Sequence, residues 1–179
     1  PVGDPNTLGE IYVHRVRAAR WLSWDTDGTM FASDIGIDNI EEINSVRNGE
    51  NYGWMRREGY FENARPRGGA IDELYPLPPE ILDGRVKDGF TYPELVYDHD
   101  EGHSVSAGFA SHGKIPALTG KFVLGDVRAG RVSPSDVRAL KKADGGFPRT
   151  WAHIDMTQRE PRPTSGRGRE PTLASSHAD

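Results

Sequence analysis

Residues 21–33 read WLSWDTDGTMFAS, and this stretch decides the fold class. Two runs with aromatic and small residues, 21–24 and 29–33, flank the turn sequence Asp-Thr-Asp-Gly. Asp-Gly is favoured between paired strands because glycine, and to a lesser degree aspartate, tolerates the positive φ of tight turns. The stretch therefore predicts a β-hairpin.

Further short runs of β-branched and aromatic residues predict more strands, at 10–13, 42–46, 94–97, 104–109 and 121–125. Only residues 136–142 predict a helix, and a short one. Residues 59–92 are rich in glycine, proline and charged residues. They predict one long loop, of the kind that forms functional lids or insertions between blades. Many short strands with little helix indicate an all-β sandwich, barrel or propeller.

Composition supports this class and disfavours several kinds of partner. The 179 residues are 35% apolar and include 21 glycines and 13 prolines, which suits a loop-rich β domain. The net charge is −5 with acids and bases interleaved, so no basic stripe points to nucleic acid. No apolar run approaches the length of a membrane span. The absence of cysteine excludes disulfides and thiol chemistry.

The composition at each end of the sequence predicts how the folded part is bounded. The chain opens Pro-Val-Gly-Asp without a start methionine or a signal peptide, so it is expected to begin inside a longer protein. Composition changes after Ile154, and residues 155–179 are expected to form a disordered, low-complexity tail. The predicted folded part is therefore 1–154. The arginines of the tail are interpreted as solvated rather than as an arm for nucleic acid.

Three stretches could carry chemistry. The loop 33–42 holds several carboxylates beside backbone carbonyls, the oxygen donors that calcium prefers, but a solvated acidic loop explains it too. The pair His99 and His103 has the spacing of a helical zinc site, but Gly102 and the flanking β-type sequence argue that the imidazoles do not converge. The arginines of 15–20 could hold an anionic cofactor, or belong to a charged edge strand.

Short motifs follow the hairpin at fixed intervals: D-I-G at 34–36, E-E-I-N at 41–44, G-E-N-Y-G-W at 49–54 and R-E-G at 57–59. Together they resemble the signature loop of the quinoprotein (PQQ-dependent) glucose/sorbosone dehydrogenase family. The likeness continues upstream in E-I-Y and L-S-W-D, and downstream in Y-D-H and G-K-F-V, so it covers roughly residues 1–154.

The resemblance implies a six-bladed β-propeller of four-stranded antiparallel sheets, of which this chain would supply two to three blades. In the family, PQQ lies over the central channel with its carboxylates on arginine and lysine side chains. Calcium bridges the cofactor and a loop, and a histidine takes the proton of the sugar hydroxyl. The implied cofactors are thus PQQ and calcium.

Carried over by position, Arg17 matches the arginine that contacts the cofactor, and Arg128 lies near the position of a cofactor-contacting lysine. Gly36 and Ile37 match the loop carbonyls that ligate calcium. Two departures stand beside these matches. The family's Asn-Pro after the arginine is Ala18-Ala19, and its glutamine after D-I-G is Ile37.

No histidine of this chain matches the family's general base, which belongs to an earlier blade. The chain is therefore expected to be an inactive part of a sugar dehydrogenase that oxidises an aldose or related sugar alcohol, with a sugar substrate and an electron acceptor in the parent protein. The alternative is a non-catalytic, ligand-binding propeller related to hedgehog-interacting protein, although that branch is disulfide-rich. A periplasmic or secreted location, and self-association through open blade edges, are further expectations.

Overall fold

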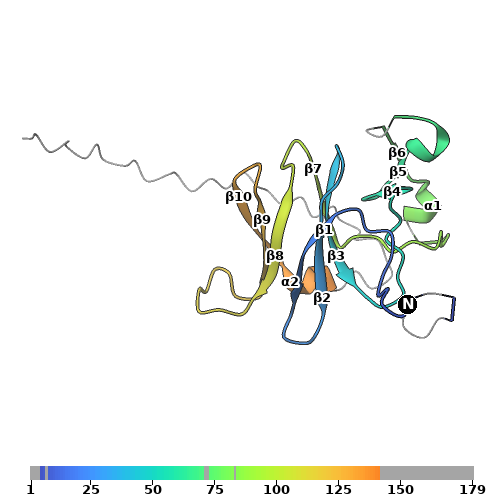
Figure 1. Ribbon diagram of the computed structural model, residues 1–179. Coiled ribbons are helices and arrows are strands. Elements are labelled where there is room, and N and C mark those ends of the chain that lie inside the picture. Colours follow the sequence, from blue (N-terminus) through green and yellow to red (C-terminus); the bar gives the residue numbers. More distant parts are fainter. Residues whose placement is uncertain (1–4, 7, 71–72, 83, 142–179) are drawn as a thin grey trace, which may run out of the picture.

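The computed structural model describes residues 5–6, 8–70, 73–82 and 84–141. The expected tail and the segment before it lie outside these residues. The elements are, in chain order (Figure 1), β1 (Ala19–Trp24), β2 (Met30–Asp34), β3 (Ile40–Val46), β4 (Arg57–Glu58), β5 (Phe61–Asn63), η1 (Arg65–Arg67), β6 (Leu74–Pro76), α1 (Pro79–Leu82), β7 (Leu95–Asp98), β8 (Val105–Ser111), β9 (Lys121–Asp126), β10 (Arg131–Asp136) and α2 (Val137–Lys141).

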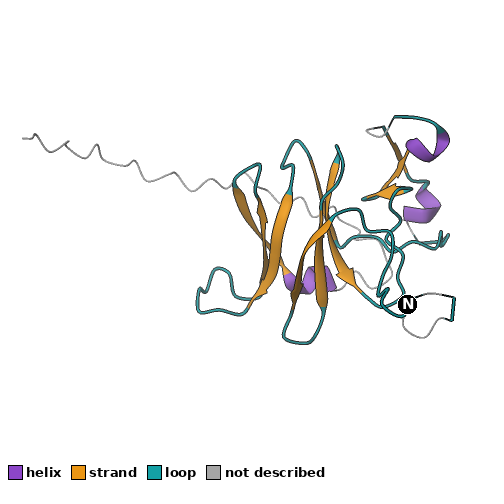
Figure 2. Cartoon of the chain, viewed as in Figure 1, coloured by secondary structure: helices purple, strands orange, loops and turns teal. Residues whose placement is uncertain are grey.

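Three antiparallel sheets account for all of these strands, and Figure 2 shows how far strands outweigh helices. The first sheet has the order β1-β2-β3-β7, and the second has the order β10-β9-β8. A small third sheet, β4-β5-β6, lies apart from them. The all-β class predicted from the sequence is confirmed.

The predicted hairpin is present as β1 and β2, with Trp24 paired to Met30. Its turn closes because the amide of Asp25 donates to the carbonyl of Thr29 at 2.9 Å. Gly28 supplies the positive φ, +86°, that the turn sequence predicted. Local chemistry alone thus explains this element.

The core lies between the first two sheets. Phe31 of β2 meets Phe122 of β9 with ring centroids 4.9 Å apart and planes tilted by 59°, a favourable geometry for aromatic rings. The helix α2, predicted at 136–142, closes the core with Val137 and Leu140. The remaining members of this cluster come from both sheets: Ile43, Leu95, Tyr97, Val105 and Leu124.

One strand prediction is wrong, and one strand of the second sheet was missed. Residues 10–13, predicted as a strand, make only irregular contacts, and pairing nearby is limited to an isolated bridge between His14 and Asn51. This segment extends beside residues 49–54 instead of joining a sheet, since the amide of Gly49 donates to the carbonyl of Tyr12. Conversely, β10 was not predicted. It holds Pro134, which is tolerated because β10 is the edge strand of its sheet.

The long loop predicted at 59–92 is partly ordered into regular structure. It contributes β5 and β6 to the third sheet and includes η1 and α1. In the described part of the chain, no helix is long and apolar enough to cross a membrane.

A buried carboxyl just before β7 predicts pH-dependent stability. Burial, the largest cause, raises the pKa of Glu94 to about 7, although the carboxylate accepts the amide of Ser45 at 2.6 Å. The folded pKa exceeds the ordinary value of 4.5, so the folded state binds more protons. Stability should therefore fall as pH rises from about 4.5 to about 7, by roughly 1.4 kcal/mol per pKa unit at most.

Glu94→Gln removes this titration and keeps an oxygen for Ser45. Urea unfolding between pH 4.5 and 8 is expected to show a shallower decline for the variant than for the wild type. Equal slopes would contradict the assignment.

Candidate functional site

The loop between β2 and β3 is anchored by Asp34, the last residue of β2. This carboxylate is 4% exposed and accepts two backbone amides from the segment before β1, from Arg17 at 2.9 Å and from Ala18 at 2.5 Å. Burial raises the pKa of Asp34 in spite of these hydrogen bonds. The anchor joins the loop 35–39 to the chain that leads into β1.

The same loop wraps around the side chain of Glu58, which comes from β4. Its Oε1 atom accepts the amides of Ile37 at 3.0 Å and of Ile40 at 3.3 Å. Glu58 is only 1% exposed, and burial raises its pKa. Its second oxygen, Oε2, is buried without a hydrogen-bond partner among the described residues.

Arg17 is fixed beside the same loop. Its guanidinium donates to the carbonyl of Ile35 at 2.8 Å and lies over the ring of Trp54, 5.6 Å from the centroid. Trp54 is itself held by its amide, which donates to the carbonyl of Arg15 at 2.8 Å. A cation over an indole ring is attracted to its face, so this arginine is held in place rather than solvated freely.

A third buried carboxyl, Glu42 of β3, lies beside the first two. Burial and then the charge of Asp34 raise the pKa of Glu42 to about 8, so this carboxyl is largely protonated at neutral pH. It accepts the amide of Gly59 at 2.6 Å and the side-chain amide of Asn44 at 3.1 Å. The three carboxyls, together with Arg17 and Trp54, line a small cavity of about 10 Å³; the three are Asp34, Glu42 and Glu58.

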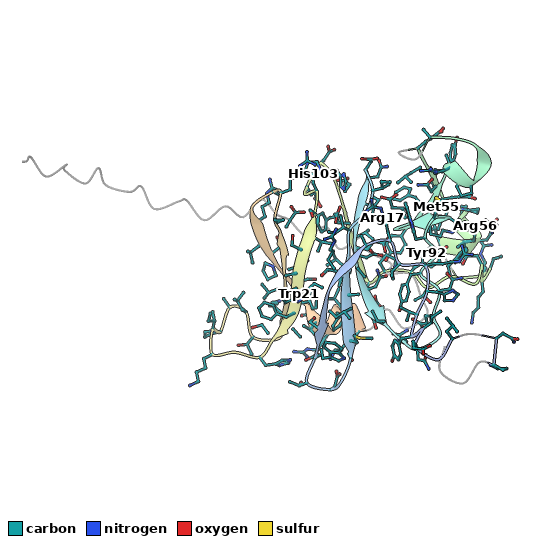
Figure 3. The ribbon with its side chains drawn as sticks, in the orientation of Figure 1. Arg17, Trp21, Met55, Arg56, Tyr92 and His103 are labelled. Atoms are coloured by element: carbon teal, nitrogen blue, oxygen red, sulfur yellow. The ribbon has the colours of Figure 1, made fainter. Side chains whose placement is uncertain are left out.

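Three of the four residues selected from the sequence meet here. Arg17, Gly36 and Ile37 belong to the anchor and loop just described. Figure 3 shows Arg17 toward one end of the sheets and Trp21 of β1 toward the other.

Arg128, the fourth, lies in the turn between β9 and β10 and does not line the cavity. Arg128 nevertheless lies at the same end of the sheets as the loop. Asp126, just before the turn, accepts the hydroxyl of Tyr97 in β7. The end of β7 pairs with the start of β3, where the loop ends.

The two histidines suspected of binding zinc lie together, contrary to the sequence-based argument. The turn after β7 brings the rings of His99 and His103 to 4.9 Å in an edge-on contact. His99 Nε2 is 2.9 Å from Glu41 Oε1, and Glu41 is fully buried. Among the described residues, no three His, Cys, Asp or Glu side chains are placed to hold a metal ion.

Glu58 and Trp54 were missed as site residues by sequence reasoning. Both stand in motifs noted there, R-E-G and G-E-N-Y-G-W, which signalled the family but not a role. Glu58 accepts amides from residues 21 and 18 positions earlier, and Trp54 contacts Arg17, which lies before β1, so no local pattern predicts these contacts.

The loop is also compatible with a cation held by backbone oxygen. Gly36 packs so closely that an added Cβ would lie 1.7 Å from the carbonyl oxygen of Ile40 and 2.8 Å from Glu58 Oε1. Residue 36 therefore has to be glycine for the backbone to follow this path. Carbonyl oxygens are hard donors of the kind calcium takes, so Gly36 and Ile37 fit the proposed ligand type.

Residues 1–145 match the family model of glucose/sorbosone dehydrogenases. The chain belongs to this family. Two solved structures have similar folds. The PQQ-bound aldose sugar dehydrogenase of Streptomyces coelicolor is 24% identical, with a TM-score of 0.51 over 75% of this chain and 31% of that one. The soluble aldose sugar dehydrogenase of Escherichia coli, in its apo form, is 19% identical, with a TM-score of 0.57 over 76% and 37%.

These likenesses confirm the fold expected from the family. The chain corresponds to part of the β-propeller of a sugar dehydrogenase, and it spans about a third of the length of these two proteins.

Proposed function

We propose that this chain is part of a PQQ- and calcium-dependent sugar dehydrogenase that oxidises an aldose or a related sugar alcohol. The single observation that carries the proposal is the fixed guanidinium of Arg17 beside the Gly36–Ile37 loop. When bound, PQQ would accept the hydride and calcium would act as a Lewis acid. The family membership supports this chemistry.

The contribution of this chain's own residues is to bind and orient. A guanidinium carries five N–H donors in a rigid fork, so Arg17 can bond Ile35 and still meet a carboxylate of the cofactor. Gly36 and Ile37 would offer carbonyl oxygens to the cation. Arg128, at the same end of the sheets, would add positive charge for an anionic ligand.

The chain by itself is proposed to bind without turnover, because none of its histidines matches the family's general base. The sugar, the electron acceptor and the general base would act in the full-length protein, for which a periplasmic or secreted location is proposed.

The test adds PQQ and calcium to the chain, and follows PQQ binding by quenching of tryptophan fluorescence and dye reduction with glucose and other aldoses. Binding that requires calcium, without dye reduction, is expected. Absence of PQQ binding, in this chain and in the full-length protein, would favour the non-catalytic ligand-binding branch instead.

Arg17→Ala is expected to weaken PQQ binding by about tenfold to a hundredfold, since a charge-assisted hydrogen bond to a buried ligand is lost. Arg20→Ala is the matched control, because Arg20 is exposed at the start of β1. The same fluorescence titration measures both variants. An equal loss of PQQ affinity in the two variants would show that Arg17 contributes only positive charge and makes no specific contact with the cofactor.

Self-association is proposed as a consequence of incomplete blade packing. Leu22 and Trp24 of β1 are 47% and 62% exposed, and Phe109 of β8 is 50% exposed. Such apolar surface favours association. Light scattering after size-exclusion chromatography should show species larger than one chain; a monodisperse monomer that melts cooperatively would argue against it.

A further inference from the structure

The side chain of Glu58 is buried against the β2–β3 loop. It reaches the loop from β4, where Glu58 pairs with Phe61. Two amides of the loop, those of Ile37 and Ile40, point at one oxygen of this carboxylate. We propose that Glu58 is the positioning residue that sets the direction of the Gly36 carbonyl, and thereby the affinity of the loop for a divalent cation.

The direction follows from the geometry of the peptide bond. In a planar trans peptide the carbonyl of one residue and the N–H of the next point in opposite directions. The Gly36–Ile37 bond is trans, since the one cis bond among the described residues joins Trp54 and Met55. Because the amide of Ile37 points at Glu58, the carbonyl of Gly36 points away from it.

The second hydrogen bond gives an internal check of this geometry. The amide of Ile40 also points at Glu58, so the carbonyl of Asn39 should point away. That carbonyl does accept a donor from outside the loop, the amide of His99 at 3.1 Å. The hydrogen bonds to Glu58 thus turn two carbonyls of the loop, those of Gly36 and Asn39, away from this carboxylate.

The packing around Gly36 leaves no room for a side chain at this position. An added Cβ on Gly36 would overlap the Ile40 carbonyl and lie 2.8 Å from Glu58 Oε1. A carboxylate can accept several N–H donors at once, which an apolar side chain of the same size cannot do. Groups behind metal ligands commonly change metal affinity by about 10- to 100-fold when removed.

This inference rests on the proposed cation-binding function, and its experiment separates the two. Three variants of the full 179-residue chain are compared with the wild type. Glu58→Ala removes the acceptor, and Glu58→Gln keeps one oxygen acceptor. Glu94→Ala is the control, because Glu94 is also buried and also accepts a backbone amide, that of Ser45, outside this loop.

The first measurement is hydrogen exchange at the amides of Ile37 and Ile40 without calcium. We expect exchange about tenfold faster or more in Glu58→Ala, and little change in Glu58→Gln and Glu94→Ala. The second is calcium titration by calorimetry, with an affinity about tenfold weaker or more in Glu58→Ala alone. A general loss of stability would affect Glu94→Ala as well, so the pattern is specific to positioning.

The outcomes are distinct. Unchanged exchange at both amides in Glu58→Ala overturns the positioning role. Faster exchange with unchanged calcium affinity overturns the link to the cation and leaves the proposed function standing. No calcium binding by the wild type removes both the calcium part of the proposed function and this link, while the exchange data still decide whether Glu58 orients the loop.

Discussion

Gly36→Ala is expected to lower the free energy of unfolding by about 3 kcal/mol, toward the upper end of the range for overpacked sites. The new Cβ would lie 1.7 Å from a backbone oxygen, that of Ile40, which cannot rotate away as the end of a side chain can. The loop must therefore open, and the hydrogen bonds from Ile37 and Ile40 to Glu58 should weaken with it. Urea unfolding followed by circular dichroism measures the change.

Gly113→Ala provides the control for glycine replacement as such. Nothing lies within 4 Å of an added Cβ at Gly113, and its φ is not positive. This variant should unfold within about 0.5 kcal/mol of the wild type, as surface substitutions usually do. A loss below 1 kcal/mol for Gly36→Ala would mean that the loop is looser than its contacts indicate. Calcium affinity should fall in the same variant if the carbonyl of Gly36 is a ligand.

Phe122→Ala is expected to destabilise the chain by about 3–5 kcal/mol, the usual range for removing a fully buried phenylalanine. Phe122 is 1% exposed and joins the two main sheets through Phe31. Since domains are stable by about 5–15 kcal/mol in total, this one change would remove a large share. Chemical denaturation with a constant m-value would report the loss.

Phe109→Ala is the matched control, because Phe109 lies on the neighbouring strand of the same sheet, next to Ala110, which pairs with Phe122, and is half exposed. About 1 kcal/mol or less is expected there, since less apolar surface returns to water. Similar losses for both variants would show that the interface between the sheets does not hold the fold together.

The contacts of the site illustrate what local sequence cannot predict. Arg17, Gly36 and Ile37 were selected by motif position, and the fold brings them to one loop. The roles of Glu58 and Trp54 were not predicted, because each depends on which strand passes beneath or beside that loop. His99 and His103 were expected to diverge, and the tertiary turn places their rings in contact.

By itself, the sequence determined the β class, the hairpin at Asp25–Gly28 and the family, because turn residues and strand residues act over a few neighbours. The strand expected at 10–13 and the unexpected β10 show where this stops. Only the tertiary structure decided that Glu58 lies under the loop and that Phe31 meets Phe122. Burial and close packing between distant segments depend on the whole arrangement of sheets, and no short stretch of residues specifies that arrangement.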